Sequence, residues 1–162
     1  MNISIFGLGY VGAVSLACLA RDGHHVIGVD IDPVKLQLIK QGQSPVIEEG
    51  MPQLMAEMAQ SGRVEVTQDT LYAINHSNVS FICVGTPSLP NGSQDQRAVI
   101  RLAEQVGQAL AAKQGYHTLV FRSTLLPGTV EGKLRQIIEE HSGKRDGEDF
   151  DICFQPEFLR EG

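Results

Sequence analysis

Residues 4–14 read SIFGLGYVGAV and place Gly7, Gly9 and Gly12 in the spacing GxGxxG. A short, β-branched run at residues 2–6 leads into the glycines, and an apolar helical pattern over residues 10–21 follows them. A strand, a Gly-rich turn and a helix in this order are typical of the first unit of a dinucleotide-binding α/β domain. Glycine clusters also occur in turns that bind nothing, so the rest of the chain has to supply the context.

The remainder of the chain repeats the alternation of strand and helix. Most of its strands are apolar at consecutive positions, as expected for a parallel sheet that helices cover on both faces. The sequence therefore predicts an α/β fold with a doubly wound, mostly parallel, six-stranded, Rossmann-like sheet, in one domain over residues 1–162. We expect strands at 2–6, 26–30, 64–67, 79–84, 118–122 and 150–154, and helices at 10–21, 33–41, 51–61, 97–113 and 129–141, with a brief helix capped by Asp69.

Three of these helices have an expected inward face. In the first, Val11, Val14 and Cys18 recur at helical spacing, and Leu16, Leu19 and Ala20 add apolar bulk. In the helix at 97–113, the shared face carries Val99, Leu102, Val106 and Leu110. In the helix at 51–61, Met55 and Met58, together with Leu54, are expected in the core.

An acidic residue after the second strand gives the glycines a functional context. Asp30 lies 23 residues after Gly7, where a carboxylate can accept hydrogen bonds from the ribose hydroxyls of adenosine. In such a site Gly7 permits the sharp turn, Gly9 lets the backbone approach a pyrophosphate, and Gly12 lets helix and strand pack closely. The helix N-terminus offers unpaired N–H groups to the phosphates. Because Asp30 would repel a 2′-phosphate, we expect NAD rather than NADP; the alternative is a turn that binds no ligand.

Polar residues follow several of the later strands. Thr86 and Thr124 come at the carboxyl ends of the strands at 79–84 and 118–122, the edge at which ligands bind in open α/β sheets. Capping of the following helices is the alternative role for both threonines. Lys35, five residues past Asp30, is by its spacing alone an ordinary solvated lysine.

The sequence PEFLREG at 156–162 ends the chain with two carboxylates four residues apart, Glu157 and Glu161. On one helical face they could act as a base or bind sugar hydroxyls. A solvated acidic turn that pairs with Arg160 is the alternative.

Composition excludes several classes of protein. A formal net charge of −6 argues against non-specific nucleic-acid binding, and no apolar run approaches the length of a membrane span. The histidines show no metal-ligand spacing. Cys18, Cys83 and Cys153 lie far apart without a CxxC pair, which predicts small buried side chains in a protein of the reducing cytoplasm.

Five motifs in order resemble the UDP-glucose/GDP-mannose dehydrogenase family over the whole chain. They are FGLGYVG (6–12), GVDID (28–32), FICVGTPS (81–88), RSTLLPGT (122–129) and PEFLREG (156–162). Within the family, SIFGLGYVGAV and SFICVGTPS followed by NG look most like the branch that acts on GDP-mannose, and the UDP-glucose branch shares softened forms of every motif.

The resemblance implies oxidation of the C6 alcohol of a nucleotide sugar to a carboxylate with two NAD, through a thioester on a cysteine. The positions that match NAD-binding motifs are Tyr10, Val11, Asp30, Lys35, Thr86 and Thr124. Glu157 matches the proposed general base, and Thr124 matches a hydroxyl that helps to place the water or oxyanion. The residues expected to contact the sugar substrate are Phe158, Leu159, Arg160 and Glu161.

Two features depart from the family pattern. Gln155 stands where family members commonly have Asn before PEFLRE, which preserves an amide. The chain stops at Gly162, whereas the family continues into a dimerising helix and a sugar-nucleotide domain that carries the nucleophilic cysteine and a catalytic lysine. We therefore expect an amino-terminal NAD-binding domain that binds NAD but does not oxidise nucleotide sugar alone.

Three alternatives stay open. The same chemistry could act on UDP-glucose or another UDP-sugar, because most of the sugar-nucleotide pocket is expected beyond this chain. A non-catalytic NAD-binding module is the second. The third is a 3-hydroxyacid or 6-phosphogluconate type of dehydrogenase, which shares the glycine fingerprint but would lack RSTLLPGT and PEFLREG in this order.

Overall fold

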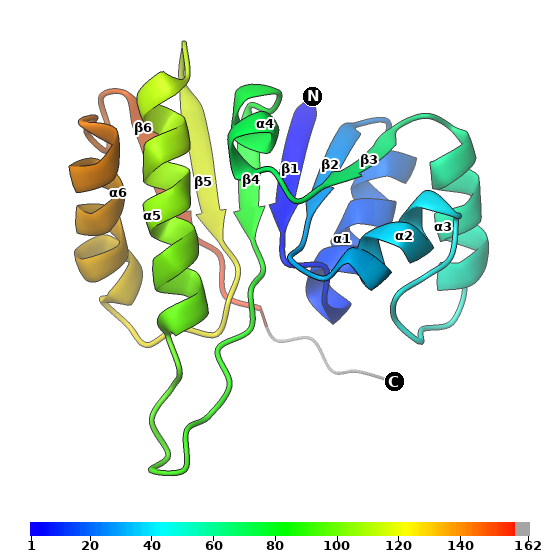
Figure 1. Cartoon of the computed structure of the whole chain (residues 1–162), viewed down its shortest axis with the longest axis horizontal. Coiled ribbons are helices and arrows are strands. Elements are labelled where there is room, and N and C mark those ends of the chain that lie inside the picture. The colour runs from blue at the N-terminus through cyan, green and yellow to red at the C-terminus, as the bar shows by residue number, and fades with distance from the viewer. Residues whose placement is uncertain (158–162) are drawn as a thin grey trace.

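Parallel strands form the centre of the protein, in the order β3-β2-β1-β4-β5-β6 (Figure 1). The computed structural model describes residues 1–157. Within them the strands are β1 (Asn2–Phe6), β2 (His25–Val29), β3 (Val64–Thr67), β4 (Val79–Ile82), β5 (His117–Phe121) and β6 (Phe150–Phe154), and every pair is parallel. The chain moves outward from β1 to β3, then returns to β4 beside β1 and moves outward in the other direction. The predicted doubly wound sheet is therefore confirmed.

Helices cover both faces of the sheet. They are α1 (Tyr10–Arg21), α2 (Pro33–Lys40), α3 (Met51–Gln60), α4 (Thr70–Asn75), α5 (Arg97–Ala112) and α6 (Arg135–Ser142), the last preceded by a π-helical segment, η1 (Thr129–Leu134). The first three contribute to one hydrophobic core and the last three to the other. Strand residues pointing either way are thus buried, which explains the consecutive apolar positions in the sequence.

The larger core lies under α4, α5 and α6. Phe6, Ile82 and Phe121 pair in register across β1, β4 and β5, and all three are buried in this core. The other core lies under α1, α2 and α3, where Met55 is fully buried and Met58 nearly so, as the sequence predicts. Leu54 is only half-buried at its margin.

The predicted inward face of α1 is wrong. Val11, Val14 and Cys18 are half-buried, whereas the fully buried positions are Ala13, Leu16, Ala17 and Ala20. The reason is the closeness of the helix to the sheet: a Cβ at Gly28 of β2 would lie only 2.6 Å from Leu16 Cδ1. Leu16 fills the contact with β2, where only a glycine leaves room for it, and the other fully buried side chains of α1 are alanines.

The cysteines are also less buried than expected. Cys18 and Cys83 are half-buried and Cys153 is exposed. Cys153 lies on β6, which is an edge strand of the sheet with a neighbour on one side only.

Two predicted helix starts are confirmed in atomic detail. Asp32 Oδ1 accepts a hydrogen bond from Val34 N at 2.9 Å, with Pro33 in the first turn of α2. Asp69 Oδ1 accepts from Tyr72 N at 3.0 Å at the start of α4. Each aspartate satisfies a backbone donor that the helix itself leaves unpaired.

A buried polar cluster joins the amino-terminal ends of the central strands. Ser80 Oγ on β4 lies 2.6 Å from Ser4 Oγ on β1 and 2.7 Å from His117 Nε2 on β5. Ser77 donates to Ser4 Oγ at 3.0 Å, and Lys113 Nζ donates to the Ser77 carbonyl at 2.9 Å. The imidazole of His117 is fully buried, and this burial, followed by the positive charge of Lys113, lowers its pKa to about 4.

This pKa predicts acid sensitivity. In the unfolded chain the imidazole has a pKa near 6.5 and takes up a proton at a higher pH than it does in the folded protein. The free energy of unfolding should therefore hold above pH 7 and fall as the pH drops from about 6.5 toward 4, by about 3 kcal/mol from this one group. Urea unfolding between pH 7 and pH 4.5 measures the slope.

His117→Gln removes the titrating group and should flatten the slope, whatever it does to stability at pH 7. His25→Gln, at an exposed histidine, is the matched control and should keep the slope. An unchanged slope in His117→Gln would show that other groups cause the acid sensitivity.

Candidate cofactor site at the carboxyl edge of the sheet

A cleft opens where the winding of the sheet reverses, between the carboxyl ends of β1 and β4. Crossovers leave these two strands in opposite directions, which creates a crevice at this edge. The cleft has a volume of about 550 Å³. Its walls include Gly7, Gly9, Asp30, Lys35, Gly85 and Arg101.

The three glycines of the opening motif have different surroundings. Gly7 has φ +91°, and a Cβ there would lie 2.9 Å from the carbonyl oxygen of Cys83. A Cβ at Gly12 would lie 1.9 Å from the carbonyl oxygen of Gly7. No side-chain rotation can relieve this overlap, because the backbone sets the position of the Cβ and the oxygen is itself a backbone atom. Around Gly9, by contrast, a Cβ would meet nothing within 4 Å. Gly7 and Gly12 are therefore required by the fold, and Gly9 leaves open space on the wall of the cleft.

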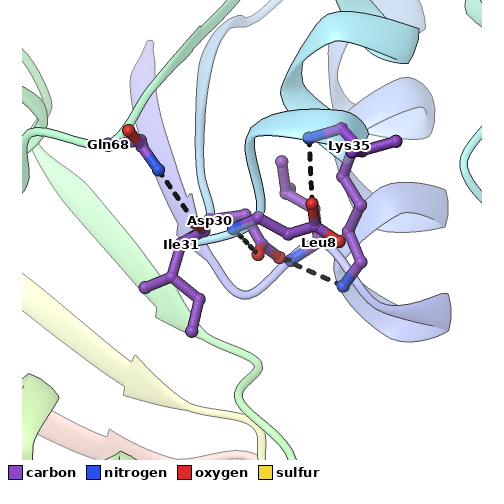
Figure 2. Close-up of polar contacts among 7 residues, drawn as sticks. Leu8, Asp30, Ile31, Lys35 and Gln68 are labelled. Atoms are coloured by element: carbon purple, nitrogen blue, oxygen red, sulfur yellow. Dashed lines mark hydrogen bonds and ion pairs between the residues drawn. The ribbon is translucent and has the colours of Figure 1, made fainter.

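Asp30 lies at the end of β2 and binds the glycine turn (Figure 2). Its Oδ2 accepts from Leu8 N at 2.7 Å, and its Oδ1 accepts from Asp32 N at 2.9 Å. Its side chain is 8% exposed. Oδ1 keeps a second lone pair, so the carboxylate can accept a further hydrogen bond from a ligand in the cleft.

Lys35 is not the ordinary solvated lysine that its spacing suggests. Its Nζ lies 3.4 Å from Asp30 Oδ2, and its side chain is 34% exposed. The ammonium neutralises the buried carboxylate and lies on the wall of the same cleft (Figure 2).

Gln68 was missed by the sequence analysis. Its Nε2 donates to the carbonyl of Ile31 at 2.8 Å and fixes the peptide between Ile31 and Asp32 (Figure 2). The side chain of Ile31 is 93% exposed although it is apolar, and both residues line the cleft. A glutamine in a loop before a helix has no local sequence signal for this contact.

Tyr10 and Val11 begin α1, and both are half-buried. The Tyr10 hydroxyl donates to the carboxylate of Glu48, which brings the loop between α2 and α3 to the start of this helix. Gly9 is the N-cap and has no side chain to satisfy the first N–H groups of α1. The helix therefore presents backbone donors toward the cleft.

Thr86 and Thr124 lie side by side, as their positions at neighbouring strand ends predict. Thr86 Oγ1 donates to the carbonyl of Thr124 at 2.6 Å. The N-caps of the helices that follow them are Gln96 for α5 and Gly128 for η1. The alternative that the threonines cap these helices is therefore wrong.

Cys83 lines the cleft directly after β4. Burial raises the pKa of its thiol to about 11, against a lowering by the Arg122 charge, and Glu157 raises it further. The sulfur is therefore protonated at neutral pH and is a poor nucleophile. Arg122, also missed by the sequence analysis, donates from Nη1 to Ser15 Oγ on α1 at 3.2 Å.

Glu157 is half-buried just beyond β6, and its negative charge contributes to the raised pKa of the Cys83 thiol. Pairing along β6 extends to Gln155, whose N–H donates to the carbonyl of Phe121 at 2.9 Å. The candidate substrate residues Phe158, Leu159, Arg160 and Glu161 lie outside the described residues.

Two further features were searched for in the part of the chain that the structure describes. Residues 1–157 hold no group of three or more His, Cys, Asp or Glu side chains able to bind a metal ion. In the same range, no helix has the length and apolar character to cross a membrane.

Comparison with known proteins gives matches along the entire chain. The sequence profile of the UDP-glucose/GDP-mannose dehydrogenase family, NAD binding domain, matches residues 1–162. GDP-mannose 6-dehydrogenase of Pseudomonas aeruginosa is 50% identical over 161 residues, which cover 99% of this chain and 37% of that protein. UDP-glucose 6-dehydrogenase AglM of Haloferax volcanii is 40% identical over 162 residues, which cover 100% of this chain and 37% of that protein.

Comparison with solved structures gives a relative of the same kind. The crystal structure of a ternary complex of GDP-mannose dehydrogenase from Pseudomonas aeruginosa superimposes with a TM-score of 0.97 at 50% identity, over 99% of this chain and 37% of that chain. The present chain thus spans 37% of the length of these relatives.

The contrast between Gly12 and Gly9 gives a paired prediction. Gly12→Ala should lower the free energy of unfolding by about 1–3 kcal/mol or more, because the methyl group overlaps the Gly7 carbonyl. Gly9→Ala should stay within about 1 kcal/mol of the unaltered protein, because its methyl group enters open space. That methyl group should nevertheless weaken NAD binding at least tenfold in calorimetry, by holding a pyrophosphate away from the backbone. Unchanged NAD affinity in Gly9→Ala would place the cofactor elsewhere.

Proposed function

Because this chain belongs to the UDP-glucose/GDP-mannose dehydrogenase family and matches its NAD-binding domain, we propose that it is the NAD-binding part of a GDP-mannose 6-dehydrogenase. Such an enzyme oxidises the C6 alcohol of the sugar to a carboxylate with two NAD. The observation that carries the proposal is the cleft at the reversal of the sheet, in which an open glycine, a helix N-terminus and a fixed carboxylate meet.

The residues of the cleft fit a dinucleotide. Open space beside Gly9 and the uncapped N–H groups of α1, near Tyr10 and Val11, suit a pyrophosphate. The remaining lone pair of Asp30 Oδ1, with the Lys35 ammonium beside the carboxylate, suits a ribose hydroxyl of adenosine. When bound there, NAD supplies the hydride acceptor for the oxidation.

Thr86 and Thr124 follow β4 and β5 at the carboxyl edge of the sheet and are not among the residues that line the cleft. In the proposed enzyme they contact the nicotinamide half. The Thr124 hydroxyl would orient water at the reacting carbon, and Glu157 would accept its proton. Glu161, with Phe158, Leu159 and Arg160, would contact the sugar. These roles rest on the motif match and on the position of the strand ends.

The nucleophilic cysteine of the proposed enzyme is a residue outside this chain. Cys83 is the cysteine on the wall of the cleft, and its protonated thiol does not suit the role. We place the nucleophile, a catalytic lysine, a dimerising helix and the sugar-nucleotide domain in the remaining length that the relatives have and this chain does not span. The cytoplasmic location predicted from the cysteines stays a prediction.

Oxidation of UDP-glucose is the second candidate function. It is favoured by the 40% identity to a UDP-glucose 6-dehydrogenase along the whole chain. The described cleft suits the shared cofactor, so the two candidates differ in the sugar-nucleotide pocket alone.

Turnover tests the assignment of the catalytic groups. With NAD and GDP-mannose, the 162-residue chain should bind NAD but give no steady increase in NADH absorbance, because the Cys83 thiol on the wall of its cleft stays protonated. The complete enzyme that contains this domain should give two NADH per GDP-mannose and should leave UDP-glucose unoxidised. Sustained NADH production by the 162-residue chain would contradict the proposal, and turnover of UDP-glucose instead would select the second candidate.

Cofactor preference tests the role of Asp30. NAD at about 100 times its Kd should stabilise the chain by about 2.7 kcal/mol, whereas NADP should stabilise it much less because its 2′-phosphate meets the buried carboxylate. Asp30→Ala should narrow the difference between the thermal shifts given by NAD and NADP. Each shift has to be measured against the ligand-free variant, because the loss of two hydrogen bonds to the backbone also lowers the stability of the variant.

Asp32→Asn is the matched control for this experiment. It removes an equal charge two residues away and retains an oxygen to cap α2, so the preference for NAD should persist. Equal shifts for NAD and NADP in the unaltered protein would rule out the role given to Asp30.

A further inference from the structure

A hairpin-like segment at residues 86–96 extends from the carboxyl edge of the sheet between β4 and α5 (Figure 1). Its two arms are held together by backbone hydrogen bonds, from Leu89 N to Ser93 O at 2.7 Å and from Asp95 N to Pro87 O at 2.8 Å. An isolated antiparallel bridge pairs Ser88 with Gln94. The segment therefore has paired arms and begins directly after Gly85, which lines the cleft.

Side chains from both arms of this segment converge on one backbone oxygen. Thr86 Oγ1 donates to the carbonyl of Thr124 at 2.6 Å, and Gln94 Nε2 donates to the same carbonyl at 3.1 Å. A carbonyl oxygen has two lone pairs, so both bonds form together. The preceding residue is fixed as well, because Ser123 Oγ donates to the carbonyl of Val84 at 2.7 Å. Side chains thus join the end of β5 to the chain that leaves β4.

The oxygen of the Gln94 amide indicates which part of this side chain makes the useful contact. Gln94 Oε1 is buried and has no hydrogen-bond partner among residues 1–157. A buried, unpaired acceptor costs about 1–3 kcal/mol, and an apolar side chain at this position would avoid that cost. The hydrogen bond that Gln94 Nε2 donates to the Thr124 carbonyl therefore explains why an amide stands at this position.

We propose that Gln94 is a positioning residue that, with Thr86, fixes the Thr124 peptide and so sets the nicotinamide end of the NAD site. The proposal rests on the function proposed above, in which Thr124 faces the nicotinamide half. The adenosine end is held independently, by Asp30 and the end of β2. Loss of the Gln94 donor should consequently affect one half of the dinucleotide and spare the other.

Binding of NAD and of ADP-ribose separates the two halves, because ADP-ribose has the adenosine and both phosphates but no nicotinamide. In calorimetry on the 162-residue chain, Gln94→Ala should weaken NAD roughly 3- to 10-fold, the effect of one lost hydrogen bond, and should leave ADP-ribose within about twofold. Gln94→Met, which keeps the length of the side chain without its amide, should behave in the same way. A purely structural role would weaken both ligands equally.

Gln96→Ala is the matched control. It removes another glutamine side chain of the same segment, one that makes no capping hydrogen bond to α5, and should leave both affinities unchanged. An unchanged ratio of the two affinities in both Gln94 variants would overturn the inference, as would an unaltered chain that binds ADP-ribose as tightly as NAD. Failure of the unaltered chain to bind either ligand would instead overturn the proposed function.

Discussion

The first helix lies so close to the first strand that residue 12 has no room for a single carbon atom beyond its backbone. A Cβ there would be 1.9 Å from the carbonyl oxygen of Gly7, and one at Gly7 would meet the backbone of Cys83. This contact fixes where α1 begins and directs its first N–H groups to the point at which the sheet reverses. The alanines of α1, the cleft and the position of Gly9 all follow from that approach.

Asp30 joins this packing constraint to the chemistry of the site. Its carboxylate accepts from the glycine turn on one side and from the start of the α2 capping turn on the other, while Lys35 balances its charge. One side chain therefore holds the loop that shapes the cleft and also offers a lone pair to a ligand in it. Loss of Asp30 changes stability and ligand preference together, so the two effects have to be measured separately.

Sequence reasoning was accurate where the signal is local. Strand and helix types, the caps at Asp32 and Asp69 and the meeting of Thr86 with Thr124 follow from periodicity, cap residues and strand ends. The predicted inward face of α1 was wrong. Hydrophobic periodicity favoured Val11 and Val14 for the core, whereas the short distance between the helix and the sheet requires small residues such as Gly12 and Ala13 there. Contacts between distant loops, such as Gln68 with Ile31, leave no periodic trace and became visible only in the structure.

The state of Cys83 has a consequence for chemical selectivity. With a pKa of about 11, roughly one sulfur in ten thousand is a thiolate at pH 7. The oxidation in the proposed enzyme passes through an aldehyde, and a second reactive sulfur in the cleft would compete to trap it and leave a dead-end adduct. The same low thiolate content protects Cys83 on the wall of the cofactor cleft from peroxide and from alkylating reagents, whereas Cys153 is exposed on β6.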